Sequence, residues 1–192
     1  AVEPDDGGQY GLRLSWYLPE LNDTELSFYY MNYHSRRPLF SGITADFSKM
    51  GSDLAYLAGN VIDEDNYANL DAFSKVILTY PEDIQLYAMS FNTTAGTTSI
   101  AGEITYRQDE PLQIDDVELL FAAMPQQLAN AGLRPDLDGV SQMETVGLGQ
   151  RADGFILSDT LQAQVTLTHL FGPRLGASQF TALMEIGGIN IN

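Results

Sequence analysis

The sequence lacks cysteine, has few basic residues and contains no long apolar run. Without cysteine there is no disulfide, no thiolate zinc site and no thiol nucleophile. Only 9 Lys and Arg stand against 26 Asp and Glu, a net charge of −17, so we expect no nucleic-acid partner. No apolar stretch approaches the roughly 18–20 residues of a membrane-spanning helix. If this chain meets a membrane, we therefore expect it to do so through strands.

Alternation of apolar and polar side chains is the most informative pattern present. In residues 10–17 the even positions are apolar, whereas the odd positions carry Gly11, Arg13 and Ser15. A period of two is typical of a strand with one apolar face. The same pattern predicts three hairpins, formed by residues 10–17 with 25–30, 83–91 with 97–107, and 160–168 with 179–186. Turn-rich segments, including residues 92–96 and 171–176, separate the paired strands.

Two long segments connect the hairpins, at about residues 35–82 and 108–155. In the second, Asp115 or Asp116 is placed to cap a helix over residues 116–124, because apolar residues follow at helical spacing. Pro125 interrupts this helix, and a further turn or two is expected before Gly132. In the first, residues 70–77 suggest an amphipathic helical turn that Pro81 ends.

Half-apolar strands fit two architectures. A soluble sandwich or small barrel hides its apolar face, whereas an outer-membrane barrel turns that face to lipid and lines its lumen with the polar one. Strand lengths near the roughly 9–11 residues of a membrane strand, aromatics at strand ends, and alternating short and long loops favour the membrane version. We therefore predict an all-β fold, an antiparallel transmembrane β-barrel segment of about six strands in three hairpins, with short helices in long loops.

Six strands are fewer than the roughly eight that a single-chain membrane barrel needs. We expect residues 1–192 to form a single domain that is an incomplete portion of a larger outer-membrane barrel, or one contributor to an oligomeric barrel.

Charged and amide side chains on the polar faces are the first candidate site. Opposed charges across a pore create a constriction that sets selectivity. We predict a lumen-lining set on this basis: Arg13, Glu103, Arg107, Gln162, Gln164 and Glu185. A closed, inert interior held by ion pairs explains the same residues equally well.

Catalytic and metal-binding patterns are sparse. The two histidines, His34 and His169, stand beside no serine elbow or metal-ligand pair, so we predict no enzyme and no resident cofactor. Calcium is a minor hypothesis, because Asp136, Asp138 and Glu144 offer oxygen ligands near one another without the spacing of an EF-hand.

Several blocks of the sequence resemble the proteobacterial family catalogued as domain of unknown function 1302. They are residues 8–12, 17–25, 30–36, 80–87, 90–93, 102–107 and 111–114, and together they extend over most of the chain. The resemblance implies an outer-membrane β-barrel about three times this length. It also implies an envelope pathway for lipids or other hydrophobic molecules, with an envelope lipoprotein and a resistance-nodulation-division type transporter as partners. No catalytic residues follow from it.

The leading hypothesis is thus a non-enzymatic outer-membrane barrel protein, in contact with outer-membrane lipid, that passes hydrophobic molecules. One alternative is a soluble, secreted β-rich module that binds a ligand or calcium. Another is a hydrolase that uses His34 or His169.

Overall fold

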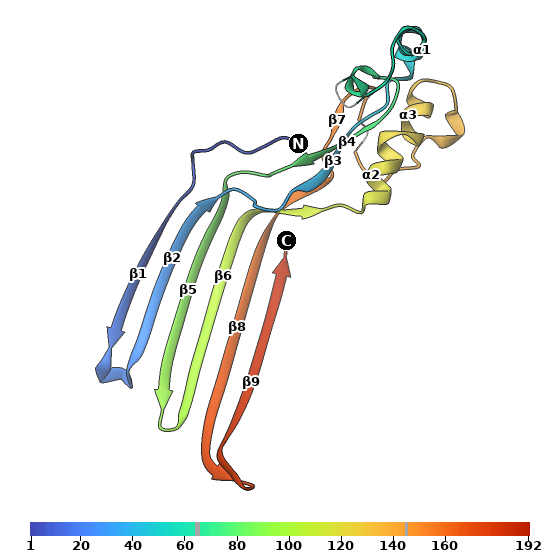
Figure 1. Cartoon of the computed structure of the whole chain (residues 1–192). Helices are drawn as coiled ribbons and strands as arrows, with labels where there is room; N and C mark the ends of the chain where they lie inside the picture. Colours follow the sequence, from blue (N-terminus) through green and yellow to red (C-terminus); the bar gives the residue numbers. More distant parts are fainter. Residues whose placement is uncertain (64–65, 145) are drawn as a thin grey trace. The chain divides into compact units, whose positions relative to one another are not determined.

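The structure is a computed structural model that describes residues 1–63, 66–144 and 146–192. The chain forms two compact units (Figure 1). Unit 1 comprises residues 1–4, 36–81 and 111–156, and unit 2 comprises residues 5–35, 82–110 and 157–192. We describe each unit by itself. That residues 1–192 act as a single domain stays a prediction.

Unit 2 is built on a sheet whose strand order is β1-β2-β5-β6-β8-β9. Its strands are β1 (Tyr10–Leu18), β2 (Thr24–Tyr33), β5 (Ile84–Ala95), β6 (Thr98–Gln113), β8 (Phe155–Arg174) and β9 (Ala177–Ile191). The β1–β2, β2–β5, β5–β6 and β8–β9 pairs are antiparallel, which confirms the three predicted hairpins. The short helix η1 (Pro19–Leu21) lies in the loop of the first hairpin.

Two hairpin turns are shorter than predicted. Residues 171–174, expected in a turn, belong to β8, and the register shifts on either side of Gly172 accommodate extra residues as β-bulges do. The reversal is made by Leu175 and Gly176, with φ values of 53° and 80°. Positive φ at both central residues is the signature of a type I′ turn, whose twist suits a hairpin. Strand β5 likewise continues to Ala95, so residues 92–95 are strand and not turn.

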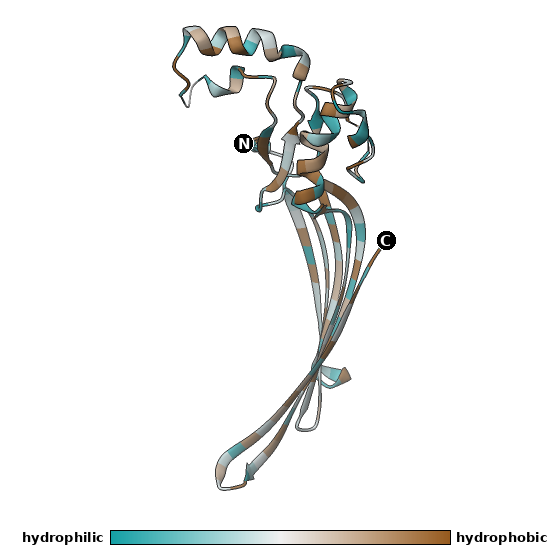
Figure 2. Ribbon diagram, turned by 90° about the vertical axis from the view of Figure 1, so that its right-hand side faces the viewer, coloured by the Kyte–Doolittle hydropathy of each residue, from teal (hydrophilic) through white to brown (hydrophobic). Residues whose placement is uncertain are grey.

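The pairing registers divide this sheet into two chemically different faces. Leu14 lies opposite Phe28, Phe28 opposite Met89, and Met89 opposite Ile104, so one apolar row crosses four strands. The next position along each strand gives the polar row Ser15, Ser27, Ser90 and Glu103. Figure 2 shows this as alternating colours along the strands. The predicted alternation therefore sorts side chains by face.

Unit 1 combines a small sheet with helices. The sheet has the order β4-β3-β7, from β3 (Leu39–Ile43), β4 (Lys75–Thr79) and β7 (Arg151–Ala152). The helices are α1 (Met50–Gly59), α2 (Asp116–Ala123) and α3 (Pro125–Asn130), with short turns η2 (Phe47–Lys49), η3 (Tyr67–Asn69) and η4 (Pro135–Leu137). Within the described residues, no helix has both the length and the apolar character needed to span a membrane.

The second long segment follows its prediction. The carboxylate of Asp115 accepts a hydrogen bond from the backbone N–H of Val117 at 2.8 Å and so caps α2. Helix α3 begins at Pro125, where the missing N–H costs no helical hydrogen bond.

The first long segment was predicted incorrectly. Residues 70–77 do not form an amphipathic helical turn, because the β-branched pair Val76 and Ile77 lies in strand β4, which pairs with β3. Helix α1 and the small sheet have no counterpart in the predictions. Strands of five residues or fewer carry too few alternating positions to be recognised.

Candidate functional site

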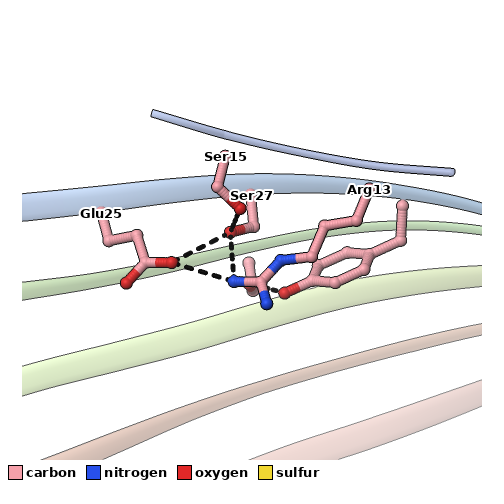
Figure 3. Close-up of polar contacts among 6 residues, drawn as sticks. Arg13, Ser15, Glu25 and Ser27 are labelled. Carbon is pink, nitrogen blue, oxygen red and sulfur yellow. Dashed lines mark hydrogen bonds and ion pairs between the residues drawn. The ribbon is translucent and has the colours of Figure 1, made fainter. Parts of the chain in front are cut away.

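The polar face in unit 2 carries, on β1 and β2, a hydrogen-bonded group of four side chains (Figure 3). The Arg13 guanidinium donates to Glu25 Oε1 at 2.9 Å and to Ser27 Oγ at 3.2 Å. Ser15 Oγ lies 2.8 Å from Ser27 Oγ. Ser15 and Ser27 are directly opposed on the two strands, whereas Arg13, which is opposite Tyr29, reaches Ser27 and Glu25 diagonally. The charge of Arg13 is thus neutralised on the sheet itself.

An aromatic ring and a shallow concavity extend this group across the sheet. The Arg13 guanidinium lies 5.4 Å from the centroid of the Tyr29 ring, within cation–π range. The Tyr29 hydroxyl is 3.3 Å from Ser90 Oγ on β5. A concavity of about 240 Å³ lies here, and its lining includes Arg13, Glu25, Tyr29, Glu103 and Gln164. Residues of the five successive strands β1, β2, β5, β6 and β8 therefore contribute to one polar surface.

The remaining predicted lining residues lie on the same face. Arg107 Nη1 donates to Gln162 Oε1 at 3.4 Å and lies 4.0 Å from Glu110 Oε2. The Thr166 hydroxyl donates to Glu185 Oε2 at 3.1 Å. The structure thus places all six predicted residues on one face, in three hydrogen-bonded groups and a concavity. That this face lines a lumen stays a prediction.

Sequence reasoning missed three contributors to this surface. Glu25, Tyr29 and Glu110 were not among the predicted lining residues, although Glu25 and Tyr29 alternate on the same side of β2 as Ser27. For Glu25 and Tyr29, the position in the alternation was the signal that would have found them. Glu110 follows Asp109, whose φ is 57°, so alternation alone does not assign its face.

The opposite face is apolar and carries a row of tyrosines. Ring centroids are 5.9 Å apart for Tyr10 and Tyr30, 5.0 Å for Tyr30 and Tyr87, and 6.3 Å for Tyr87 and Tyr106. The row follows four neighbouring strands, and the Tyr106 hydroxyl donates to Asp159 Oδ2 at 2.6 Å. Tyr30, Tyr87 and Tyr106 thus stand directly opposite one another on β2, β5 and β6, and Tyr10 on β1 lies diagonally beside Tyr30.

The side chains of this apolar face are largely uncovered. Leu12 is 60% exposed, Ile104 40%, Val165 42% and Met184 51%. Both edge strands of the sheet, β1 and β9, consist almost entirely of exposed residues. An apolar surface on this scale marks a site of contact with a protein partner or a membrane.

The predicted calcium ligands make separate contacts and do not surround one common site. Arg134 donates to both carboxylate oxygens of Asp136 at 2.8 and 2.6 Å, which lowers the pKa of Asp136 and raises that of Arg134. Asp138 and Glu144 border a different cavity of about 100 Å³, where Asp138 Oδ1 accepts from Gln126 at 3.0 Å. The described part of the chain contains no group of three or more His, Asp or Glu side chains placed to hold a metal ion. Calcium binding stays a prediction.

Both histidines are occupied by hydrogen bonds. His34 is only 4% exposed, its Nε2 lies 2.7 Å from the Gly7 carbonyl oxygen, and its Nδ1 accepts from the Asp83 N–H at 3.1 Å. His169 Nδ1 lies 2.7 Å from the Thr98 hydroxyl oxygen. In these contacts, neither ring is paired with a serine positioned as a nucleophile. That the chain is not an enzyme stays a prediction.

Comparison with known proteins identifies the family. No curated protein matches the sequence. No solved structure matches the chain either. The family model described as "Protein of unknown function (DUF1302)" matches residues 1–192, the whole chain, and the protein therefore belongs to that family.

Proposed function

We propose that unit 2 is part of the wall of an outer-membrane β-barrel, with its apolar face toward lipid and its polar face toward an aqueous lumen. The observation that carries this proposal is the reversal of ordinary burial in one antiparallel sheet. Ile104 is 40% exposed on one face, whereas Ser27 on the other is 2% exposed. In water such an arrangement leaves apolar area unburied, whereas in a bilayer the same area faces hydrocarbon.

Strand length and the tyrosine row support the same proposal. Each of the six strands has at least nine residues, and a tilted membrane strand needs about 9–11. Tyrosines gather at membrane interfaces because the ring is apolar and the hydroxyl needs a polar partner. The row formed by Tyr10, Tyr30, Tyr87 and Tyr106 fits one such interface.

The barrel is proposed to pass lipids or other hydrophobic molecules across the envelope, without catalysing a reaction. The resemblance of the sequence to its family motivates this part, together with an envelope lipoprotein and a transporter of the resistance-nodulation-division type as partners. The polar surface around Arg13 and Arg107 is then the portion of the wall that a passing molecule or a loop contacts.

Cell fractionation and heat modifiability test the location. The protein that carries this chain is expected to sediment with the outer membrane, to need detergent for solubility, and to change its electrophoretic mobility on boiling. A monodisperse protein in detergent-free buffer contradicts the proposal and favours the soluble, secreted binding module.

Single-channel recording tests the lining role. In planar bilayers, replacing Arg13 and Arg107 with Gln is expected to change conductance or ion selectivity, because both charges would face the lumen. Replacement of Arg134, whose partner Asp136 lies in unit 1, is the matched control. Unchanged conductance and selectivity in the Arg13 and Arg107 variants would discard the lining role while leaving the location intact.

A further inference from the structure

Within unit 2, His34 joins both ends of the segment of residues 5–35 to the start of the segment of residues 82–110. The chain makes five such passages, after residues 4, 35, 81, 110 and 156. His34 lies directly before the second passage, its partner Gly7 lies just after the first, and Asp83 just after the third. One side chain therefore links three positions of unit 2, each next to a different one of the five passages.

The two hydrogen bonds of the ring require one protonation state. A backbone N–H only donates, so Nδ1, which faces the Asp83 N–H at 3.1 Å, must carry no proton. A carbonyl oxygen only accepts, so Nε2, 2.7 Å from the Gly7 oxygen, must carry one. The arrangement is thus complete only with a neutral imidazole protonated at Nε2. At 4% exposure, the ring has little water to replace a lost partner.

Neighbouring groups reinforce this connection. Asn32, 7% exposed, donates to the Gly8 carbonyl oxygen and to Asp83 Oδ1, each at 2.9 Å. Gly8 has a φ of 84° and Asp83 one of 58°, so both segments turn sharply where they meet the ring. A Cβ at Gly8 would lie 3.4 Å from His34 Cε1, and the segment packs directly on the imidazole.

The other titratable groups that line the cavity beside His34 are acidic. The ring borders an open cavity of about 370 Å³ that also carries, from the N-terminal segment and from the segment before β5, Asp5, Asp6, Glu82 and Asp83. The backbone N–H of Asp5 donates to Glu82 Oε1 at 3.0 Å, which links the same two segments again. Among the described residues, no Lys or Arg lines this cavity.

We propose that His34 is an acid-sensitive latch that holds the segments of Gly7 and Asp83 together when neutral and releases Asp83 when protonated. Proton uptake places an N–H at Nδ1 opposite the Asp83 N–H, so neither group keeps an acceptor. The new N–H at Nδ1 turns instead toward a carboxylate, and that of Asp83 is adjacent. Histidine is the side chain whose ordinary pKa lies nearest neutral pH, so the latch is tested by comparing mildly acidic with mildly basic solution. This inference does not depend on the membrane location.

Amide hydrogen exchange on the full-length protein tests the latch. After correction for the intrinsic pH dependence of exchange, the Asp83 amide is expected to exchange at least about tenfold faster at pH 5 than at pH 8, while amides in the middle of β5 keep their protection. Equal corrected rates at both pH values would overturn the proposal. So would equal acceleration throughout unit 2, because that result signals general unfolding.

His34→Gln provides a matched variant. A glutamine amide offers one acceptor and one donor without titrating, so exchange at Asp83 is expected to become independent of pH. His169→Gln, the other histidine of the chain, is expected to leave the wild-type pH response unchanged. A pH response that persists in His34→Gln and disappears in His169→Gln would assign the effect to the wrong residue and refute the latch.

The ring itself supplies a measurement that does not depend on any variant folding. Nitrogen-15 chemical shifts of the His34 ring at pH 8 are expected to show a protonated Nε2 and a bare Nδ1. A proton on Nδ1 at that pH would contradict the arrangement from which the latch is inferred.

Discussion

The two units differ in how many hydrophobic residues they bury. Of the buried hydrophobic residues among those described, only Ile84 lies in unit 2, whereas unit 1 contains Ala45, Ala72, Leu119, Ala122, Ala123 and Ala152. Unit 2 instead buries Ser27, Asn32, His34, Thr105, Ser158 and Thr160. Unit 1 buries polar residues as well, namely Ser41, Thr44, Asp53, Thr79, Gln126 and Gln127, but beside them it has an apolar core. Unit 2 buries polar residues almost alone and leaves its apolar side chains exposed, the reverse of the usual distribution. This difference is the one that the proposed membrane location would explain.

The largest expected effect comes from placing a charge on the apolar face of unit 2. Under the proposed membrane location, Val165→Arg is expected to destabilise the folded protein in lipid vesicles by roughly 2–4 kcal/mol, the cost of a cationic side chain on the lipid-facing surface of a membrane strand. Gln164→Arg is the matched control, because the neighbouring residue lies on the polar face. Denaturant titration in vesicles measures both. Equal effects of the two substitutions would remove the distinction between the faces.

The two units also differ in how much of their structure could be predicted from the sequence, because their strands differ in length. In unit 2, long strands repeat the two-residue period many times, so Leu12, Arg13 and their neighbours could be assigned to faces correctly. In unit 1, β3 and β7 are short, and contacts between distant residues such as Thr44 and Gln150 stabilise them. Such contacts leave no local periodicity in the sequence.

The candidate site shows the same limit at the level of single contacts. Alternation placed Arg13 on the polar face, but its partners Glu25 and Ser27 depend on the register of β1 with β2. A register is set by turn geometry, and here two residues at positive φ, Asn22 and Asp23, occupy the turn. Faces were thus predictable, whereas pairs were not.

A smaller expected effect tests the close packing of unit 1. A Cβ on Gly154 would lie 2.0 Å from the carbonyl oxygen of Phe40 and 3.0 Å from Leu119 Cδ2. Gly154→Ala is therefore expected to destabilise unit 1 by about 1–3 kcal/mol, the usual cost of overpacking. Hydrogen exchange should show lost protection in unit 1.

Gly51→Ala is the control for this prediction, because nothing lies within 4 Å of the Cβ that would be added in α1. Alanine also has a higher helix propensity than glycine, so the protection of amides in α1 should stay the same or rise. If both variants lost the same protection, the packing of Gly154 against Phe40 would not explain the effect.

The smallest expected effect concerns the ion pair of Arg134 and Asp136, which are 57% and 61% exposed. The guanidinium lowers the pKa of Asp136, so the contribution of this pair to stability is fully present above the ordinary pKa of aspartate and is lost as the pH falls through the lowered one. Carbon-13 titration of the Asp136 carboxyl is expected to show its midpoint rise toward the ordinary value in Arg134→Gln. Solvent screening keeps the change in stability near zero. An unchanged midpoint would mean that the pair does not persist in solution, and Asp136 would then be free to serve as the cation ligand that the sequence predicts.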